Sequence, residues 1–315
     1  MVPGEAGGLQ LETRSPGRDL LVVGHTNLDR FLSVADFPGP DRTVPVLGQR
    51  TVLGGTAANI ARSAAAWGVP TGLLSRVGKD FPSGFLRQMA AEGIDLRGVE
   101  IVPDAPSPTC FIVQSRLGNQ RTMIDQGPMG DAADAPISTS LVKEYSWVHL
   151  TTGDPVYQLR VADVARRLGL RVAADPAQEI HFRWSASQLR ALLENSEILF
   201  GNVAEAKKAT SLMGLTTPAA LTKLVPLVIV TDGPRGATAY DRRGVQRVRA
   251  APSRRGTSRV GAGDAFRGGF YAAWFAGESL EHCLKAGTRS AARWIQKGGP
   301  ERAARTRSKK PPRKR

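Results

Sequence analysis

Short apolar runs alternate along the chain with segments of helical character, and this alternation predicts an α/β protein with a parallel, doubly wound sheet. Each apolar run has the length of a short buried strand. The predicted strands cover residues 20–23, 147–150, 171–174, 197–200 and 227–230. The clearest predicted helices between them are residues 161–168 and 203–212.

Two β-prone segments interrupt this alternation. Prolines divide residues 37–50 into short pieces, which is typical of an edge or an excursion and not of a central strand. Residues 109–124 read as a hairpin around a Gly-Asn turn at residues 118–119. Together they predict a small second sheet that covers a site as a lid, from about residues 30–52 and 100–126.

Polar side chains follow several predicted strands, and the carboxyl edge of an open α/β sheet is where ligands bind. Asn27 and Asp29 follow the first strand, and Asp29 either accepts two sugar hydroxyls or is a turn or cap residue. Asn202 and Glu205 follow another strand and supply an amide and a carboxylate that could reach phosphate or hydrated magnesium. The other polar clusters are residues 151–154, 175–179 and 231–236.

The stretch Gly261-Ala262-Gly263-Asp264 runs from a small-residue turn into a helix. Its first three residues leave backbone N–H groups at the helix start, where they and the helix dipole attract an anion. Asp264 would repel a bound phosphate, which indicates a chemical role. Phosphoryl transfer to a hydroxyl needs fixed donors beside a carboxylate that accepts the hydroxyl proton. The alternative is a glycine-rich loop that ends in an Asp helix cap.

The helix after Asp264 carries Phe266, Phe270 and Trp274 at helical spacing, which predicts a buried face. Gly268 and Gly269 lie inside it, although each Gly costs roughly 1 kcal/mol relative to Ala in a helix interior. We therefore predict close backbone packing at this pair.

A second glycine-rich stretch, residues 54–61, precedes an Ala-rich helix that ends before Gly68. Gly55 permits close approach of a ligand. Asn59 is a poor helix former in the first turns, so it either caps the helix or hydrogen-bonds a ligand. On this stretch alone we favour capping.

The charge of the chain is concentrated at one end. The 315 residues carry a formal net charge of +15, and residues 301–315 hold eight basic side chains against one acidic one. Such a tail is typically disordered, with weak, salt-sensitive and sequence-blind affinity for polyanions. We treat it as an accessory, and residues 1–17, rich in Gly and Pro, as a disordered leader.

Several protein classes are disfavoured. Cys110 and Cys283 make no disulfide framework, and with the four histidines they show no zinc spacing. We find no secretory segment and no apolar run long enough for a bilayer, so we expect a cytoplasmic protein without membrane contact. The absence of a Walker A motif and of Gly-x-Gly-x-x-Gly after the first strand argues against a P-loop ATPase and a nicotinamide dehydrogenase.

From about Leu20 to Pro300 the chain resembles the ribokinase-like (PfkB) family of sugar and nucleoside kinases. Residues 54–61 and 261–264 match its two signatures, and Asn202-x-x-Glu205 matches a third element. Residues 23–29, 152–155 and 175–179 are similar to the archaeal nucleoside kinase branch. The resemblance implies a three-layer α/β/α domain over residues 18–300 with a small β lid. It also implies transfer of the γ-phosphoryl group of ATP, with Mg²⁺, to the 5′-hydroxyl of a nucleoside.

The resemblance also implies roles for individual residues. Asp264 is the base and Gly261, Ala262 and Gly263 form the anion hole. The substrate is held by Asp29, Asn27, Gly55, Asn59, Gln126, Gly127 and Gln178. The nucleotide is lined by Asn202, Thr231, Gly233 and Gly236, and Glu205 serves magnesium.

One departure concerns Ser258 and Arg259, where the family usually has Asp-Thr. In many relatives this part of the loop helps to place a monovalent cation beside the site, so activation by such a cation is open for this chain. Our hypothesis is that Arg259 supplies positive charge near the phosphates in place of the ion. Two alternative functions also stay open: a kinase of a free sugar, sugar phosphate or polyol, and a non-catalytic nucleoside- or sugar-binding protein. An exposed edge of the lid would be buried by a homodimer.

Overall fold

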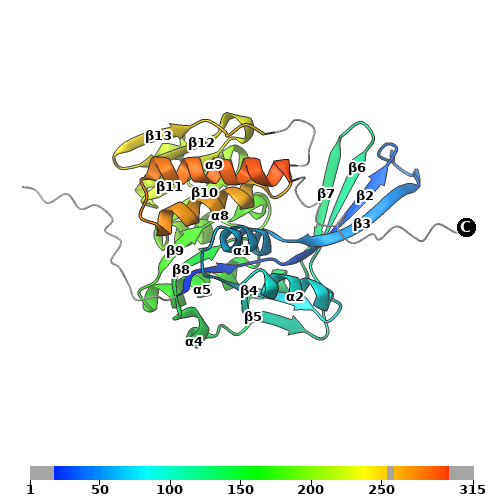
Figure 1. Ribbon diagram of the computed structural model, residues 1–315, viewed down its shortest axis with the longest axis horizontal. Coiled ribbons are helices and arrows are strands. Elements are labelled where there is room, and N and C mark those ends of the chain that lie inside the picture. Colours follow the sequence, from blue (N-terminus) through cyan, green and yellow to red (C-terminus); the bar gives the residue numbers. More distant parts are fainter. Residues whose placement is uncertain (1–17, 254–258, 298–315) are drawn as a thin grey trace, which may run out of the picture.

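The computed structural model describes residues 18–253 and 259–297. Within these ranges the chain forms a nine-stranded sheet and a separate four-stranded sheet (Figure 1). The predicted leader, residues 1–17, the predicted basic tail, residues 301–315, and Ser258 lie outside the described residues.

The large sheet has the strand order β13-β12-β11-β10-β9-β8-β1-β4-β5. All pairs from β5 to β11 are parallel, and β12 and β13 add an antiparallel edge. This confirms the predicted mostly parallel α/β sheet. Its strands are β1 (Arg18–Val23), β4 (Thr71–Gly78), β5 (Asp95–Val102), β8 (Tyr145–Leu150), β9 (Arg171–Ala174), β10 (Ile198–Asn202), β11 (Leu227–Thr231), β12 (Ala237–Asp241) and β13 (Gly244–Val248).

Helices cover both faces of the large sheet, so the predicted three-layer α/β/α arrangement is confirmed (Figure 1). Alternate residues of β1 show the two faces, because Leu20 and Val22 belong to one hydrophobic cluster and Leu21 and Val23 to the other. The first cluster packs against α1 (Thr56–Ala66), α2 (Ser83–Ala91), α8 (Ala262–Phe275) and α9 (Leu280–Gln296). The second packs against α3 (Gly127–Gly130), α4 (Thr139–Val142), α5 (Pro155–Arg167), α6 (Ala186–Glu194) and α7 (Val203–Leu212).

Local chemistry sets the helix boundaries. The predicted helix over residues 161–168 begins six residues earlier, at Pro155, because the Asp154 side chain accepts hydrogen bonds from the N–H groups of Val156 and Tyr157. The remaining turns are 3₁₀ helices: η1 (Ala177–His181), η2 (Pro218–Lys223) and η3 (Gly233–Arg235).

Two glycines bring α8 against its neighbours, as predicted. A Cβ on Gly268 would lie 2.3 Å from Oγ of Ser63 on α1, and one on Gly269 would lie 2.5 Å from Cβ of Ser290 on α9. The backbones therefore approach more closely than any larger residue allows.

The small sheet consists of β2 (Asn27–Val34), β3 (Val46–Gly54), β6 (Thr109–Ser115) and β7 (Gln120–Asp125), in the order β3-β2-β6-β7. It stands off from the helices of the large sheet (Figure 1). The antiparallel β6–β7 pair is the predicted hairpin. The predicted lid boundary at residue 100 is wrong, because residues 100–102 pair with β4 in the large sheet.

Two further sequence predictions concern cysteines and membrane spans. Cys110 and Cys283 carry free thiols. Across residues 18–253 and 259–297, no helix has both the length and the apolar character that crossing a membrane requires.

Candidate active site

A cavity of about 650 Å³ lies where the small sheet meets the carboxyl ends of the large-sheet strands and the start of α8. Most residues predicted for the site line it. They are Asn27, Asp29, Gly55, Asn59, Gln126, Gln178, Asn202, Glu205, Thr231, Gly233, Gly236, Gly261, Ala262, Gly263 and Asp264. Gly127 is the exception, because it begins α3 behind Gln126 and does not line the cavity.

The start of α8 forms one wall of the cavity. Gly261 has a left-handed backbone (φ 79°), which a side chain would strain, and a Cβ there would lie 3.1 Å from the Trp294 ring. The N–H of Ala262 donates to the Arg259 carbonyl at 3.0 Å. The prediction of three free donors therefore fails at Ala262, whose N–H closes the turn.

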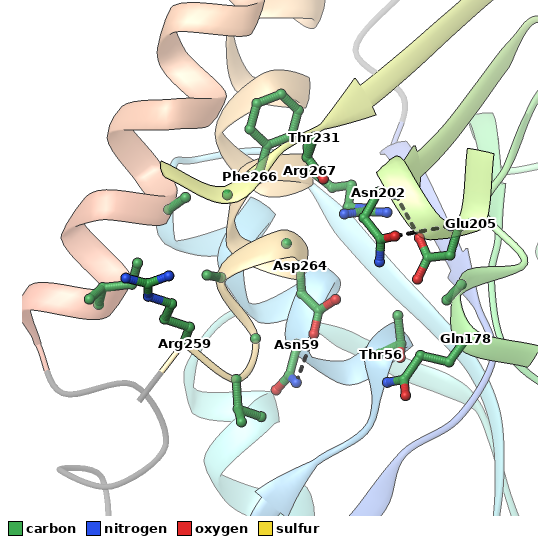
Figure 2. A pocket seen from close by; sticks show the side chains of 18 of the residues that line it. Thr56, Asn59, Gln178, Asn202, Glu205, Thr231, Arg259, Asp264, Phe266 and Arg267 are labelled. Atoms are coloured by element: carbon green, nitrogen blue, oxygen red, sulfur yellow. Dashed lines mark hydrogen bonds between the residues drawn. The ribbon is translucent and has the colours of Figure 1, made fainter. Parts of the chain in front are cut away.

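Asp264 lies in the first turn of α8, but its side chain does not cap the helix, so the helix-cap alternative is wrong. Nδ2 of Asn59 donates to Oδ2 of Asp264 at 3.0 Å (Figure 2). Helix α1 has Gly55 as its N-cap residue, so the capping interpretation of Asn59 is also wrong. Asn59 instead links α1 to α8, through a hydrogen bond between two residues that are 205 positions apart in the chain.

The Asp264 carboxylate is partly open to the cavity and otherwise surrounded by protein. Burial raises its pKa to about 6, against the opposing effects of the Arg267 charge and the Asn59 hydrogen bond. A carboxylate with this pKa is ionised at neutral pH and is a stronger base than an ordinary Asp.

Asp29 lies inside β2, so the alternative of a turn or cap residue is wrong. It is 5% exposed, and the structure gives it no hydrogen-bond partner among the described residues. Burial and then the charge of Asp264 raise its pKa to about 7. Asn27, two residues before on the same face of β2, has a buried Oδ1 that also has no partner in the described chain. Buried polar groups are normally hydrogen-bonded, so these two side chains are candidates for contact with a polar ligand.

Asn202 and Glu205 form a capping box at the start of α7. Oδ1 of Asn202 accepts from the Glu205 N–H at 3.0 Å, and Oε2 of Glu205 accepts from the Asn202 N–H at 2.7 Å (Figure 2). Burial and then the charge of Asp175 raise the pKa of Glu205. The motif therefore has a structural role, in addition to any role toward a ligand.

No group of three or more His, Cys, Asp or Glu residues in the described part of the chain is arranged to hold a metal ion. Glu205 and Asp264 nevertheless both line the cavity. A Mg²⁺ ion with one or two carboxylates, water and substrate phosphates fits this donor set, because Mg²⁺ keeps several waters in such sites.

Arg267 lines the cavity as well and was missed as a site residue. Its Nε and Nη2 donate to the two carboxylate oxygens of Asp175, at 2.6 and 2.8 Å. Oδ2 of Asp175 also lies 3.3 Å from Nε2 of His149, and Nδ1 of His149 lies 2.7 Å from the Tyr271 hydroxyl. Despite burial, Arg267 and His149 lower the pKa of Asp175. The sequence did contain a signal for this residue, because Arg267 lies inside a run of small and aromatic residues that predicts burial. A buried charge requires a partner, so a charged partner could have been expected.

The opposite wall is built around Gln126. The His25 Nε2 lies 3.0 Å from the Gln126 carbonyl and donates to it, and burial lowers the His25 pKa to about 4, so the ring is neutral. Glu179, whose Oε2 accepts from the Gly153 N–H at 2.6 Å, also lines the cavity. Burial raises the pKa of Glu179 to about 7. Gln178 is exposed on η1.

The end of β11 and the loop that follows it bring Thr231, Gly233 and Gly236 to the cavity. Gly236 has φ 105°, and a Cβ there would lie 2.0 Å from the Val248 carbonyl oxygen, so this turn also requires glycine. Arg259 lines the cavity with an exposed side chain that points toward α9 in Figure 2.

Comparisons with known proteins show which family and which proteins the chain resembles. Residues 18–307 match the pfkB family of carbohydrate kinases. The chain is 34% identical over 271 residues to a nucleoside kinase of Methanothermobacter thermautotrophicus, covering 85% of this chain and 86% of that protein. It is 32% identical over 271 residues to a nucleoside kinase of Thermoplasma acidophilum, covering 86% and 87%. The crystal structure of the Methanocaldococcus jannaschii nucleoside kinase, an archaeal member of the ribokinase family, superposes with a TM-score of 0.81 at 28% identity, covering 91% of this chain and 96% of that one.

Proposed function

The chain belongs to the pfkB family of carbohydrate kinases, and we propose that it transfers the γ-phosphoryl group of ATP to the 5′-hydroxyl of a nucleoside. Family membership makes it a phosphotransferase that acts on an alcohol, and implies the use of ATP. The nucleoside acceptor is supported by the likeness to nucleoside kinases along most of the chain. The observation that carries the mechanism is the Asn59–Asp264 hydrogen bond, which holds a basic carboxylate at the start of α8.

Asp264 acts as the general base in this proposal. It takes the proton of the acceptor hydroxyl as the oxygen attacks the γ-phosphorus. Asn59 orients the carboxylate and leaves its other oxygen, Oδ1, for the hydroxyl. The N–H groups of Gly261 and Gly263 and the dipole of α8 stabilise the negative charge on the phosphoryl group.

The acceptor occupies the side of the cavity next to the small sheet. Asp29 and Asn27 bind the ribose hydroxyls, which is supported by the buried Asn27 Oδ1 without a partner in the described chain and by the position of the buried Asp29 at the cavity. Gly55 has φ 95°, and a Cβ there would lie 2.4 Å from the His25 carbonyl, so the backbone can approach the sugar closely. Gln126 and Gln178 contact the base, and Gly127 shapes the backbone behind Gln126.

ATP occupies the other side. Asn202, Thr231, Gly233 and Gly236 line the nucleotide in this proposal. Glu205 binds magnesium, directly or through water, and the ion neutralises charge on the phosphates when bound. Arg259 adds positive charge near the phosphates. In relatives that have Asp-Thr at the positions of Ser258 and Arg259, this part of the loop helps to hold a monovalent cation.

The test is ATP consumption by the purified protein with Mg²⁺ on a panel of nucleosides, free pentoses, hexoses and inositol, with Asp264→Asn alongside. Turnover on nucleosides that collapses in the variant supports both the acceptor and the base. Turnover on sugars alone keeps the mechanism and moves the acceptor to the carbohydrate alternative, since fold and signatures are common to both. Nucleoside binding without turnover would favour the non-catalytic alternative.

Three properties outside the reaction complete the proposal. We propose a homodimer through β7, which is an exposed edge strand carrying Met123 and Ile124 on its surface. Residues 301–315 make weak contacts with polyanions through their basic side chains. The protein acts in the cytoplasm. Sedimentation of Met123→Asp against the unchanged protein tests the dimer, and a salt titration of RNA binding tests the tail.

A further inference from the structure

Arg267 lies directly against the turn that begins α8. A Cβ on Gly263 would lie 2.9 Å from Nη1 of Arg267. Because residue 263 is a glycine, this nitrogen can lie next to the backbone of the turn. The Arg267 side chain is 6% exposed, and the residue lines the cavity. Its exposed part therefore faces the same space as the Gly261–Asp264 turn.

The orientation of the guanidinium is fixed from behind. Within the described chain the guanidinium donates two hydrogen bonds, both to Asp175. One comes from Nε and the other from Nη2. Asp175 is itself fully buried and held by His149. This bidentate pair directs Nη1 away from Asp175, toward Gly263. Figure 2 shows the guanidinium next to Asn202, on the same side of the cavity as Glu205 and Asp264.

The charges around this space do not by themselves favour an anion, so the case for one at Nη1 rests on the hydrogen-bond geometry of the guanidinium. Despite burial, the charges of Asp175, Glu205 and Asp264 raise the pKa of Arg267, so the guanidinium stays charged among three carboxylates. A guanidinium nitrogen in a largely desolvated cavity interacts with phosphate oxygens much more strongly than an exposed one does.

We propose that Nη1 of Arg267 donates a hydrogen bond to the phosphoryl group during transfer, and that Asp175 is the positioning residue that orients it. This inference rests on the proposed kinase function. The acceptor oxygen forms a bond to the γ-phosphorus, and the bond from the γ-phosphorus to the bridging oxygen of ADP breaks with its electron pair on ADP. The hydroxyl proton goes to Asp264. Arg267 exchanges no proton and stabilises the charge on the phosphoryl oxygens.

A purely structural role would leave Arg267 as the buried partner of Asp175. The two roles differ in what they do to the transition state. A structural partner affects stability and all ligands alike, whereas a phosphoryl contact acts on turnover and on analogues of the transferring group.

The experiment compares Arg267→Gln, Arg267→Lys and Asp175→Asn with Arg289→Gln, which removes an exposed arginine of α9 that does not line the cavity. Each variant is measured for kcat and KM, and for its affinity for Mg²⁺-ADP with and without aluminium fluoride. We expect Arg267→Gln to lower kcat about 100-fold or more, with smaller changes in either KM, and to abolish the extra affinity from aluminium fluoride. Arg267→Lys restores part of both, because it keeps the charge but not the fork. Asp175→Asn gives a smaller loss, and Arg289→Gln none.

A folded Arg267→Gln variant with kcat within about threefold of the unchanged protein, or with the extra affinity from aluminium fluoride intact, would overturn the inference. If that variant does not fold, Asp175→Asn/Arg267→Gln removes both buried charges together and takes its place, with the same expected loss of kcat. Failure of the proposed function looks different, because the unchanged protein then phosphorylates no nucleoside. The aluminium fluoride measurement requires no acceptor and still tests Arg267 in that case.

Discussion

The two ends of the cavity are built in different ways. At the start of α8 the polar side chains are bonded to one another before any ligand binds, as the pairs Asn59–Asp264 and Asp175–Arg267 show. At the small sheet, Asp29 has no protein partner in the described residues, and β7 is exposed along its whole length. Under the proposed function, the phosphoryl-transfer end is therefore preorganised, whereas the acceptor end obtains its hydrogen bonds from the ligand.

This difference separates rate from affinity. Groups that are already fixed act mainly on the transition state, and groups that wait for the ligand act mainly on binding. Variants at the two ends should therefore change different kinetic constants, and the active-site variants below test that division.

The largest effect is expected from Asp264→Asn at the preorganised end. The amide cannot accept the hydroxyl proton, so kcat should fall about 10³-fold while the KM for the acceptor changes little. Asp131→Asn is the matched control, because this carboxylate is exposed and does not line the cavity. Equal losses in kcat and in nucleoside affinity would contradict the division between the two ends.

Asp29→Asn should have the next largest effect, and on a different constant. Loss of charged hydrogen bonds to the sugar hydroxyls weakens binding by about 1.5–3 kcal/mol, which raises the acceptor KM roughly 10- to 100-fold. The KM for ATP should stay nearly constant. Steady-state kinetics with each substrate varied in turn distinguishes this from a general loss of activity, which would argue that Asp29 supports the chemistry itself.

Gly268→Ala tests the packing that holds the preorganised end together. The new Cβ would lie 2.3 Å from Oγ of Ser63, so α8 must move away from α1, and we expect a loss of about 1–3 kcal/mol in the free energy of unfolding. Gly48→Ala in β3 of the small sheet is the control, since no atom lies within 4 Å of its new Cβ. Denaturant unfolding of both variants gives the comparison, and similar losses would refute the role of close packing.

The sequence alone allowed predictions for those site residues that are neighbours in the chain. Gly261 and Asp264 could be assigned because a turn and the helix after it place both residues without help from distant segments. Asn59 and Arg267 could not. Their partners are 205 and 92 positions away, so local propensity suggested a helix cap for the first and gave no role for the second.

The same limit applies to the fold. The strands β8 to β11 were predicted because each is a short, mainly apolar segment, typical of a strand buried on both faces. Strand β4 was missed because Gly72, Ser75 and Arg76 interrupt its apolar residues, although Ser75 is 2% exposed in the sheet. Tertiary packing decides such cases, and periodicity alone does not.

The two carboxylates should also respond to pH at different points. Asp29, with a pKa of about 7, is protonated first as the pH falls, and Asp264, with a pKa of about 6, follows. The acceptor kcat/KM should therefore begin to fall below about pH 7, and should fall more steeply below about pH 6, where Asp264 is protonated as well; kcat should fall with the protonation of Asp264 in the substrate complex. Asn59→Ala removes a hydrogen bond that lowers the Asp264 pKa, so the fall in kcat should begin at higher pH. An unchanged kcat profile in Asn59→Ala would count against Asp264 as the titrating base.

The smallest effect is expected at Arg259. This residue lies just before the Gly261–Asp264 turn in the sequence, but its side chain is not held by the bonded pairs of the preorganised end. Its side chain is exposed and points toward α9, whereas Arg267 is buried and anchored (Figure 2). Because solvent screens an exposed charge, Arg259→Ala should weaken ATP binding only about two- to fivefold, with little change in kcat. The weakening should disappear in high salt, which titration calorimetry at two ionic strengths would show. Unchanged turnover and unchanged ATP affinity at low salt would mean that Arg259 supplies no charge to the phosphates.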